Sequence, residues 1–558
     1  MATSGVPSPW NEAPLVCAAL LVAVVAWCAA RAAEWAWLRP RRLGRALRAQ
    51  GLRGTAYRPI SGDAALADRL ALEARSRPPL PPGCHAVVPR AMPLFHRAME
   101  EHGKTSITWS GPVPRVTIAD PALVRQVLSN KLGHFEKPGF GQLQRLLHYG
   151  VSTHQGAKWA RHRSIINPAF HLDKLKVTIN GRTIRNPTRT NNNAEQRRVS
   201  RLNLDRFVQR MLPAFASCCG DLVGRWEGLA AAAGAGEARE VDVWPEMQRL
   251  TGDVISRAAF GSSYLEGRRI FQLQDEQVRR DTCVMLPTRT NRRMKRIAAE
   301  IEGILGGMIA KREGAMRAGE AATGDDLLGL MLESNMEQCG GMSADDVIGE
   351  CKMFYFVGME TTSILLTWTM VLLSMHPEWQ DRAREEVLRV FPGGGAAGTG
   401  TAPDYDGLSR LKIVTMVLYE ALRLYTPLPA VHRRTYKPVE LGGVRYPAGV
   451  TLVLPLLSVH HDKDVWGPDA EEFRPERFSE GVAGAAGGAD RPPAFFAFGG
   501  GPRTCVGQSF ALLEAKMGLT MILRSFVFEL SPSYSHAPFP VPLLKPERGA
   551  QVRIRKLP

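Results

Sequence analysis

Residues 496–507, FAFGGGPRTCVG, constrain the fold more than any other part of this 558-residue chain. Consecutive glycines followed by Pro502 let the backbone turn tightly, and a helix-like segment, QSFALLE, starts directly after Gly507. In such a turn, backbone N–H groups and the N-terminus of the following helix stabilise a thiolate. We therefore predict that Cys505 is a metal ligand. The alternative is an ordinary free Cys in a glycine-rich loop.

A long apolar helix is predicted from the cap-like Ser343-Ala344-Asp345-Asp346 to about Met375, because His376-Pro377 follows. It contains the motif FVGMETTS at 356–363. There Gly358 leaves room against a flat cofactor, Thr361 can turn its hydroxyl to the backbone or to dioxygen, and Glu360 can relay protons. Alone, this motif would more often be an ordinary buried Thr and a satisfied Glu.

Charged residues at helical spacing suggest two further clusters. Glu420 and Arg423 lie at i, i+3 on one helical face, and FRPERF at 473–478 supplies Arg477 as a third member of a buried ionic triad. Trp159 and Arg163 lie at i, i+4. Either Arg433 or Arg434 could join the second cluster, and the sequence does not choose between them.

The pattern F-x-x-G-x-R-x-C-x-G, together with the order of the other motifs, resembles the cytochrome P450 superfamily. The resemblance implies a mainly α fold with a small β portion and a haem b whose iron is bound by Cys505. It further implies that Glu360 and Thr361 are catalytic and that Glu420, Arg423 and Arg477 are structural. The residues implied to contact the cofactor are Trp159, Arg163, Gly358, Arg434, Phe498, Arg503 and Gly507.

Stretches such as RVTIADPALVRQVLSNKLGHFEKP and NPAFHLDKLK resemble the plant cytochrome P450 family numbered 72. This resemblance implies a monooxygenase that inserts one oxygen atom of O2 into a C–H bond of a hydrophobic isoprenoid, such as a triterpenoid or a gibberellin. It also implies electrons from an NADPH–cytochrome P450 reductase and a monomeric protein.

The N-terminus is predicted to be a membrane anchor. Residues 13–30 are apolar and uncharged, whereas Arg31, Arg39, Arg41 and Arg42 follow them. By the positive-inside rule, residues 1–12 are lumenal and the rest is cytosolic, with the endoplasmic reticulum as the expected membrane. A cleaved signal peptide is disfavoured because no Lys or Arg precedes the apolar run. Residues 31–83, ending in PPLPPG, are predicted to be a membrane-proximal segment and hinge, before a catalytic domain at 84–558.

The basic composition has a similar explanation. Lys and Arg outnumber Asp and Glu by 71 to 54, which gives +17, yet no basic-aromatic nucleic-acid module is present. We therefore expect an anionic membrane or an acidic protein as the partner, and no nucleic acid. Nine Cys at irregular spacing exclude a disulfide scaffold and a CxxC zinc site.

Two segments depart from the plant family. Residues 177–209 form a polar insert with seven Arg against two acids. It is interpreted as a disordered surface loop, or as an in-frame retained intron, since Val177 requires a codon beginning with GT and Gln209 could be CAG. Residues 278–285 are shorter than usual in the roof over the substrate. Val357 stands where the family has Ala or Gly.

Other function classes remain open at this stage. One is a haem-binding but catalytically impaired relic, disabled by the insert or by the short roof. A second is a membrane-anchored interaction protein without haem. A third is an isomerase or dehydratase that needs no reductase, against which Thr361 argues.

Overall fold

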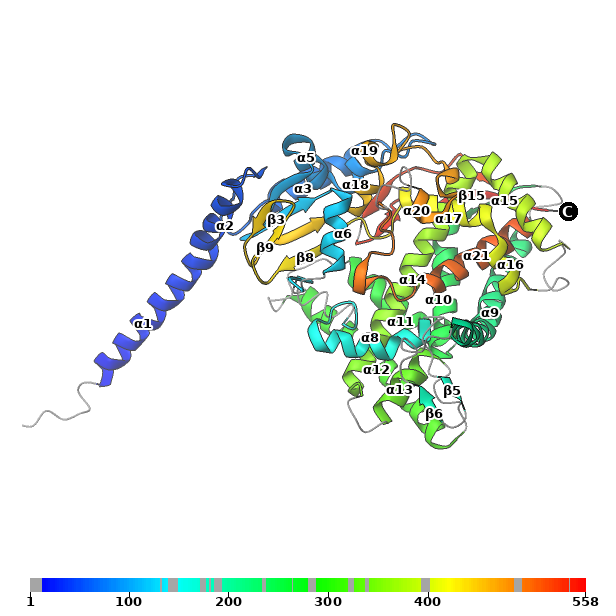
Figure 1. Cartoon of the computed structure of the whole chain (residues 1–558), viewed down its shortest axis with the longest axis horizontal. Coiled ribbons are helices and arrows are strands. Elements are labelled where there is room, and N and C mark those ends of the chain that lie inside the picture. Colours follow the sequence, from blue (N-terminus) through cyan, green and yellow to red (C-terminus); the bar gives the residue numbers. More distant parts are fainter. Residues whose placement is uncertain are drawn as a thin grey trace, which may run out of the picture.

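A computed structural model of the chain shows a helical body from which helix α1 (Ala13–Ala33) projects (Figure 1). Helices hold 62% of the structure and strands 12%, which confirms the mainly α prediction. The residues that the structure describes are 13–130, 133–138, 149–170, 177–179, 182–184, 193–232, 237–262, 264–279, 288–319, 326–336, 341–392, 402–485, 494–540 and 542–557.

The N-terminal helix continues into the body without a break. After α1 come a π-helical turn, η1 (Glu34–Leu38), and α2 (Arg39–Arg48). In the apolar window of this helix no residue is buried, so it is a candidate membrane span. In α2, by contrast, Leu47 is fully buried, and a Cβ on Gly44 would lie 3.1 Å from the Trp109 ring. The end of the anchor helix is thus packed onto the body.

Six strands form the main sheet in the order β1-β2-β3-β11-β8-β4. Strands β2 and β3 pair antiparallel on either side of Gly111-Pro112. The bounds are β1 Arg53–Gly54, β2 Thr105–Ser110, β3 Val113–Ile118, β11 Thr451–Leu454, β8 Val431–Thr435 and β4 Phe135–Glu136. The smaller sheets contain β12 (Phe526–Leu530), β15 (Gln551–Lys556) and β7 (Arg239–Asp242), β9 (Val439–Leu441) and β10 (Val444–Tyr446), and β13 (Pro538–Pro540) and β14 (Leu544–Pro546).

The proposed boundary at residue 83 does not separate two bodies. Strand β1 pairs in parallel with β2, with Arg53 opposite Ser106, and the Leu80 N–H donates to the His536 carbonyl at 2.9 Å. Long-range hydrogen bonds therefore attach the segment before residue 84 to the rest of the body. Residues 1–12 lie outside the described residues.

Helices make up most of the body, with α14 (Ala344–Met375) at its centre. The Ser343 hydroxyl accepts from the Asp346 N–H at 3.2 Å, as the capping pattern predicts. Although α14 is apolar enough to span a membrane, 83% of its apolar window is buried inside the protein. The other helices are α3 Ala64–Ser76, α4 Val88–Ala91, α5 Pro93–His102, α6 Pro121–Ser129, α8 Gly156–Phe170, α9 Asn193–Ala231, α10 Val243–Phe260, α11 Tyr264–Arg279, α12 Arg289–Arg317, α13 Leu327–Met336, α15 Pro377–Val390, α16 Tyr405–Arg410, α17 Lys412–Leu424, α18 Leu456–His460, α19 Lys463–Trp466, η3 Pro475–Phe478, α20 Gly481–Gly484, η4 Gly501–Arg503 and α21 Gln508–Ser525.

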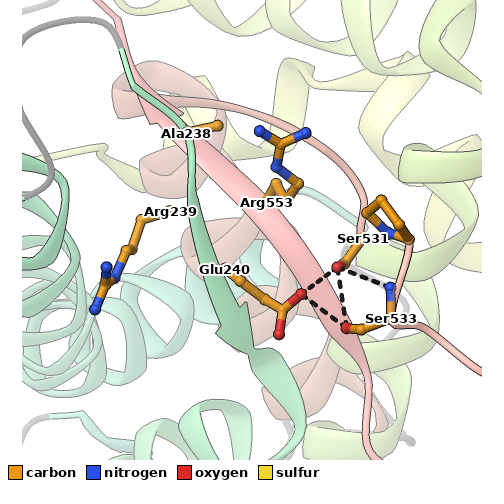
Figure 2. Close-up of a pocket in the computed structure, with 7 residues that line it drawn as sticks. Ala238, Arg239, Glu240, Ser531, Ser533 and Arg553 are labelled. Carbon is orange, nitrogen blue, oxygen red and sulfur yellow. Dashed lines mark hydrogen bonds between the residues drawn. The ribbon is translucent and has the colours of Figure 1, made fainter.

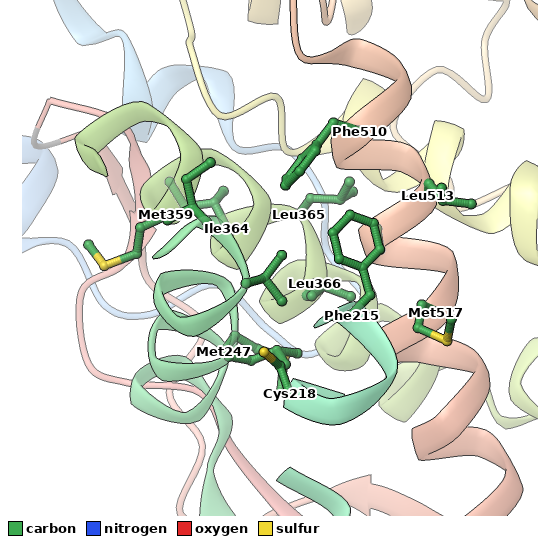
Figure 3. Packing of buried hydrophobic residues seen from close by; sticks show 14 of the residues in the cluster. Phe215, Cys218, Met247, Met359, Ile364, Leu365, Leu366, Phe510, Leu513 and Met517 are labelled. Carbon is green, nitrogen blue, oxygen red and sulfur yellow. The ribbon is translucent and has the colours of Figure 1, made fainter. Parts of the chain in front are cut away.

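The core joins α14 to the helix that follows the cysteine loop. Side chains of α9, α10, α14 and α21 interdigitate there (Figure 3). Phe215 of α9 packs edge-on against Phe510 of α21, with ring centroids 5.0 Å apart. Because α21 begins three residues after Cys505, this packing fixes the loop relative to α14.

The same core contains a carboxylic acid. Glu514 of α21 is 1% exposed, and burial raises its pKa well above the usual value, although a hydrogen bond from Thr362 opposes this rise. A raised acid pKa in the folded state means that folding takes up a proton once the pH exceeds the unfolded pKa of about 4.3. Stability therefore falls as the pH rises above that value.

Glu514→Gln removes this titration while it keeps the size and the hydrogen-bonding capacity of the side chain. We expect the variant to melt at least about 2 °C above the wild type at pH 8. The gap is expected to shrink toward pH 5. Thermal unfolding followed by circular dichroism across this range measures the gap, and a pH-independent gap contradicts the assignment.

The insert departs from the loop prediction. Strands β5 (Val177–Ile179) and β6 (Arg182–Ile184) pair antiparallel, and α9 begins at Asn193. Ala, Glu, Gln and Arg favour helix, so residues 193–209 extend α9 backward. In the shortened roof, Val278 and Arg279 end α11, whereas residues 280–287 lie outside the described residues.

Candidate functional site

The cysteine loop is held by left-handed glycines. Gly501 has φ +66°, and a Cβ there would lie 2.3 Å from the Leu128 carbonyl oxygen, so no other residue fits without displacing α6. The Cys505 N–H donates to the Phe498 carbonyl at 2.9 Å. This bond closes the turn and places Cys505 immediately before α21.

The environment of Cys505 disfavours a charged sulfur in the protein alone. Burial raises the pKa of the Cys505 thiol, whereas the Gly507 N–H and the Arg163 guanidinium lower it. Burial is the largest of these effects. A bound cation reverses this balance, because a coordinating thiol is deprotonated.

Four cationic side chains gather beside the loop. The Arg503 guanidinium donates to the His154 carbonyl at 2.9 Å and stacks 4.5 Å from the centre of the Trp159 ring. Burial is the main cause that lowers the pKa of Arg503 to about 10, and Arg163 adds to the effect. Arg433 and Lys137 complete the cluster. Burial and then Arg503 lower the pKa of Arg433 to about 10. Burial, followed by Arg433 and Arg503, lowers the pKa of Lys137 to about 7.

The register of the main sheet explains which arginine joins the cluster. Neighbouring residues of β8 point to opposite faces. Arg433 is 6% exposed and lies near Arg503, whereas Arg434 pairs with Glu136 of β4 and lies beside Arg39 near Gly449. Continuing that register places Lys137 opposite Arg433. The geometry thus favours Arg433 over the predicted Arg434.

One face of α14 is partly exposed in the middle of an otherwise buried helix. Between residues 349 and 374, only Val357, Gly358 and Thr361 are not buried. The Thr361 hydroxyl donates to the Val357 carbonyl at 2.8 Å, which leaves its lone pairs free to accept. Gly358 faces α10, where a Cβ would lie 2.7 Å from the Ile255 side chain. Its small size lets α10 approach α14.

Glu360 is buried and paired. Its carboxylate lies 2.5 Å from the Lys545 ammonium and accepts a hydrogen bond from Gln248 at 3.1 Å. The Lys545 side chain is 16% exposed, so this pair extends from α14 toward the surface. Sequence reasoning identified Glu360 but not its partner on β14.

The predicted ionic triad lies behind the cysteine loop. Glu420 and Arg423 are both fully buried and form two hydrogen bonds of 2.7 Å. Arg477 lies 3.6 Å from Glu420 but pairs more closely with Asp469, at 2.9 Å. Arg423 also donates to the His460 carbonyl at 2.7 Å.

A second contact of His460 connects this triad to the cysteine loop. Its Nε2 accepts the Phe496 N–H at 2.9 Å, nine residues before Cys505. Burial lowers the pKa of His460 to about 3, so the ring is neutral and can accept. Arg423 therefore fixes His460, and His460 in turn binds Phe496 at the start of the cysteine loop.

A model of the cytochrome P450 family matches residues 88–183 and 176–554 of the chain. The chain belongs to the cytochrome P450 family. The two matched pieces meet within residues 176–183, where the polar insert begins.

The relatives agree with the resemblance to plant family 72. Cytochrome P450 CYP72A616 of Paris polyphylla is 52% identical over 97% of this chain and 98% of the relative. Cytochrome P450 72A15 of Arabidopsis thaliana is 44% identical over 96% and 98%. A solved structure, retinoic acid-bound cyanobacterial CYP120A1, has a TM-score of 0.68 at 21% identity, covering 86% of this chain and all of that one. The last match shows the fold alone.

Cytochromes P450 bind haem b, and the cation cluster fits that cofactor. Among the described residues, no carboxylate forms an ion pair with Lys137, Arg163, Arg433 or Arg503. Arg433 is buried, and Lys137, Arg163 and Arg503 are partly buried. Removing such cations from water without an ion pair is costly. Because haem b carries two propionates, it supplies the missing negative charge, while its iron supplies the cation that Cys505 requires. The residues present therefore match haem b both at its propionates and at its iron.

Sequence reasoning missed Lys137, His460 and Asp469. Lys137 follows a two-residue strand and reaches the cluster only through pairing with β8, about 300 residues later. No local pattern around these three residues signals their roles.

Lys137→Met tests the cation cluster. Losing a hydrogen bond to a charged group costs about 1.5–3 kcal/mol, so we expect the variant to release haem at least about tenfold faster than the wild type. Transfer of haem to an excess of scavenger protein, followed by absorbance, measures the rate. Lys104→Met is the matched control, since Lys104 pairs with Asp464 on the surface at 2.8 Å. Wild-type release rates in Lys137→Met contradict the assignment.

A surface hollow of about 590 Å³ lies elsewhere, on the three-stranded sheet (Figure 2). Arg239, Glu240 and Arg553 line it, with Glu240 bound by the hydroxyls of Ser531 and Ser533. None of its lining residues belongs to the cysteine loop, the cation cluster or α14. It is therefore separate from the site of Cys505.

Proposed function

We propose that this cytochrome P450 hydroxylates a hydrophobic isoprenoid, with electrons from an NADPH–cytochrome P450 reductase. The observation that carries the proposal is that Cys505 lies beside four cations that form no ion pair among the described residues, in a chain similar to family 72 along nearly its full length. Haem supplies the oxidation chemistry when bound. A disabled relic has no support in the comparisons.

Each part of the site has a proposed role. Cys505 binds the iron, while Arg163, Arg433, Arg503, Trp159 and Lys137 hold the propionates. Phe498 and Gly507 shape the proximal turn. Thr361 lies on the partly exposed face of α14, where its hydroxyl would hold a proton for the bound haem's chemistry, and Glu360 with Lys545 would connect that position toward the surface.

The membrane and the reductase complete the proposal. Residues 13–30 span the endoplasmic reticulum membrane once, with the catalytic body cytosolic and monomeric. Because α2 is packed against the body, the anchor holds the body beside the bilayer, where isoprenoids dissolve. The reductase would dock on the side of the cysteine loop, and the net charge of +17 suits an acidic partner.

Microsomes that contain the protein and a plant reductase test this proposal. Triterpenoids, gibberellins and monoterpenoids are incubated with NADPH under 18O2, and products are analysed by mass spectrometry. The proposal predicts a product with a single 18O atom that depends on both NADPH and the reductase. Holoprotein that converts none of these classes, but does convert another lipophilic class, contradicts the isoprenoid assignment.

A further inference from the structure

A second cluster of metal-binding side chains lies outside the haem site. His154 precedes α8, His162 lies within it, and Glu350 comes from the first turns of α14. One ligand atom of each residue lies within 4.8 Å of the other two. All three residues are buried, with exposures of 5%, 0% and 0%.

Two imidazole nitrogens in this cluster have no hydrogen-bond partner: His154 Nε2 and His162 Nε2. His154 Nε2 lies 3.8 Å from the Glu350 carboxylate, and His162 Nε2 lies 3.7 Å from the Asp346 carboxylate. These separations are too long for hydrogen bonds. A buried polar atom without a partner calls for an explanation, such as a bound ion.

We propose that His154, His162 and Glu350 bind one Zn²⁺ ion, with Asp346 as an outer partner of His162. Imidazole and carboxylate are ordinary zinc ligands, at about 2.0–2.2 Å, and a water completes a four-coordinate site. In a tetrahedral site, ligand atoms are about 3.3 Å apart. When zinc binds, the distance from His154 Nε2 to the Glu350 carboxylate, 3.8 Å, must shorten slightly. The distance from His162 Nδ1 to the same carboxylate, 2.6 Å, must lengthen.

Asp346 makes the exchange of a proton for zinc feasible. His162 Nδ1 and the Glu350 carboxylate share a hydrogen bond of 2.6 Å, in which the Nδ1–H tautomer of His162 is the donor. When zinc takes Nδ1, the proton moves to Nε2, which faces the Asp346 carboxylate. A zinc-bound histidine whose other nitrogen donates to a carboxylate is a common arrangement. Lys158 in turn holds Asp346 at 2.6 Å.

The backbone and the nearby charges favour a preformed site. The Val151 N–H donates to the second Glu350 oxygen at 2.9 Å, and a Cβ on Gly150 would lie 2.5 Å from that oxygen. Burial is the largest cause that lowers the pKa of His154 to about 4, with smaller contributions from His162, Lys158 and Arg503. The ring is therefore neutral at pH 7 and can bind a metal.

Zinc is separable from haem because the two sites share no ligand. They are adjacent, since the His154 carbonyl accepts from Arg503. By binding both His154 and Glu350, zinc would fix the loop before α8 to α14.

Zinc titration of the full-length holoprotein in detergent, after dialysis against a chelator, tests the proposal. Bound zinc per haem is measured by elemental analysis, and its ligands by X-ray absorption. We expect one zinc with an all-N/O shell that contains two imidazoles. His154→Gln should weaken binding at least about tenfold, since even outer partners are worth 10–100-fold. His96→Gln is the matched control, because the surface pair His96–Glu100, at 3.3 Å, offers zinc a non-specific His–Glu site.

The outcomes separate clearly. Wild-type protein that binds no zinc at micromolar concentration, or binds it with sulfur in its shell, overturns the proposal. So does equal binding by His154→Gln and wild type. If His154→Gln loses its haem, the X-ray absorption spectrum of zinc bound to the wild-type protein decides for or against the proposal. Cys sites and surface His sites give different spectra from a two-imidazole site.

Discussion

Glu420→Ala is expected to lower the free energy of unfolding by about 3–5 kcal/mol and to leave little folded holoprotein. Glu420 is fully buried and forms two 2.7 Å hydrogen bonds with Arg423. Its removal leaves the Arg423 charge buried without a counter-ion. Because Arg423 also holds the His460 carbonyl, the start of the cysteine loop loses its support.

Denaturant unfolding and the amount of bound haem measure this effect. Glu476→Ala is the control, because Glu476 pairs with Arg382 at 3.8 Å, with both side chains about half exposed. Exposed pairs contribute little, about 0–1 kcal/mol. Equal losses in the two variants contradict a special role for the buried pair.

Thr361→Val is expected to reduce product formation per NADPH about 100-fold, the size of a typical contribution from proton transfer, while haem binding is retained. Valine keeps the shape of the side chain but removes the hydroxyl, which lies on the partly exposed face of α14 and donates to the Val357 carbonyl. The hydrogen peroxide released and the product formed are measured together, because electrons that do not reach product must appear elsewhere.

Thr369→Val is the matched control for this change. Thr369 lies two turns farther along α14, and its hydroxyl donates to the Leu365 carbonyl at 2.7 Å, four residues back, as Thr361 does. Thr369 is fully buried, so it does not lie on the partly exposed face of α14. A similar loss in both variants would assign the effect to the helix rather than to the hydroxyl at position 361.

Local patterns predicted the features that depend on nearby residues. The glycine-rich turn at 499–507, the Ser343 cap and the spacing of Glu420 and Arg423 each require only a few consecutive residues, and each is present in the structure. Motif order then indicated the family, which the comparisons confirm.

Features that depend on strand register could not be predicted. Arg433 and Arg434 are chemically alike, and only pairing of β8 with β11 and β4 decides which faces Arg503. Lys137 reaches the site through the same pairing. The sequence did not show that Ile255 approaches Gly358, because a glycine in a helix signals close approach without saying which neighbour approaches.

Composition alone did not predict the structure of residues 193–209. Its polar, arginine-rich residues indicated a loop, yet residues 193–209 extend α9. Helix propensity in that half was readable, but polarity was weighted above it.

The carbon monoxide difference spectrum of reduced membranes tests the central claim most directly, because it reports the ligand of the haem iron. Wild-type protein is expected to give a strongly red-shifted Soret band, and Cys505→Ala none. Cys218→Ala, which changes a thiol buried in the core, should keep the band. A red-shifted band that survives in Cys505→Ala would contradict thiolate ligation by this residue and with it the assigned site.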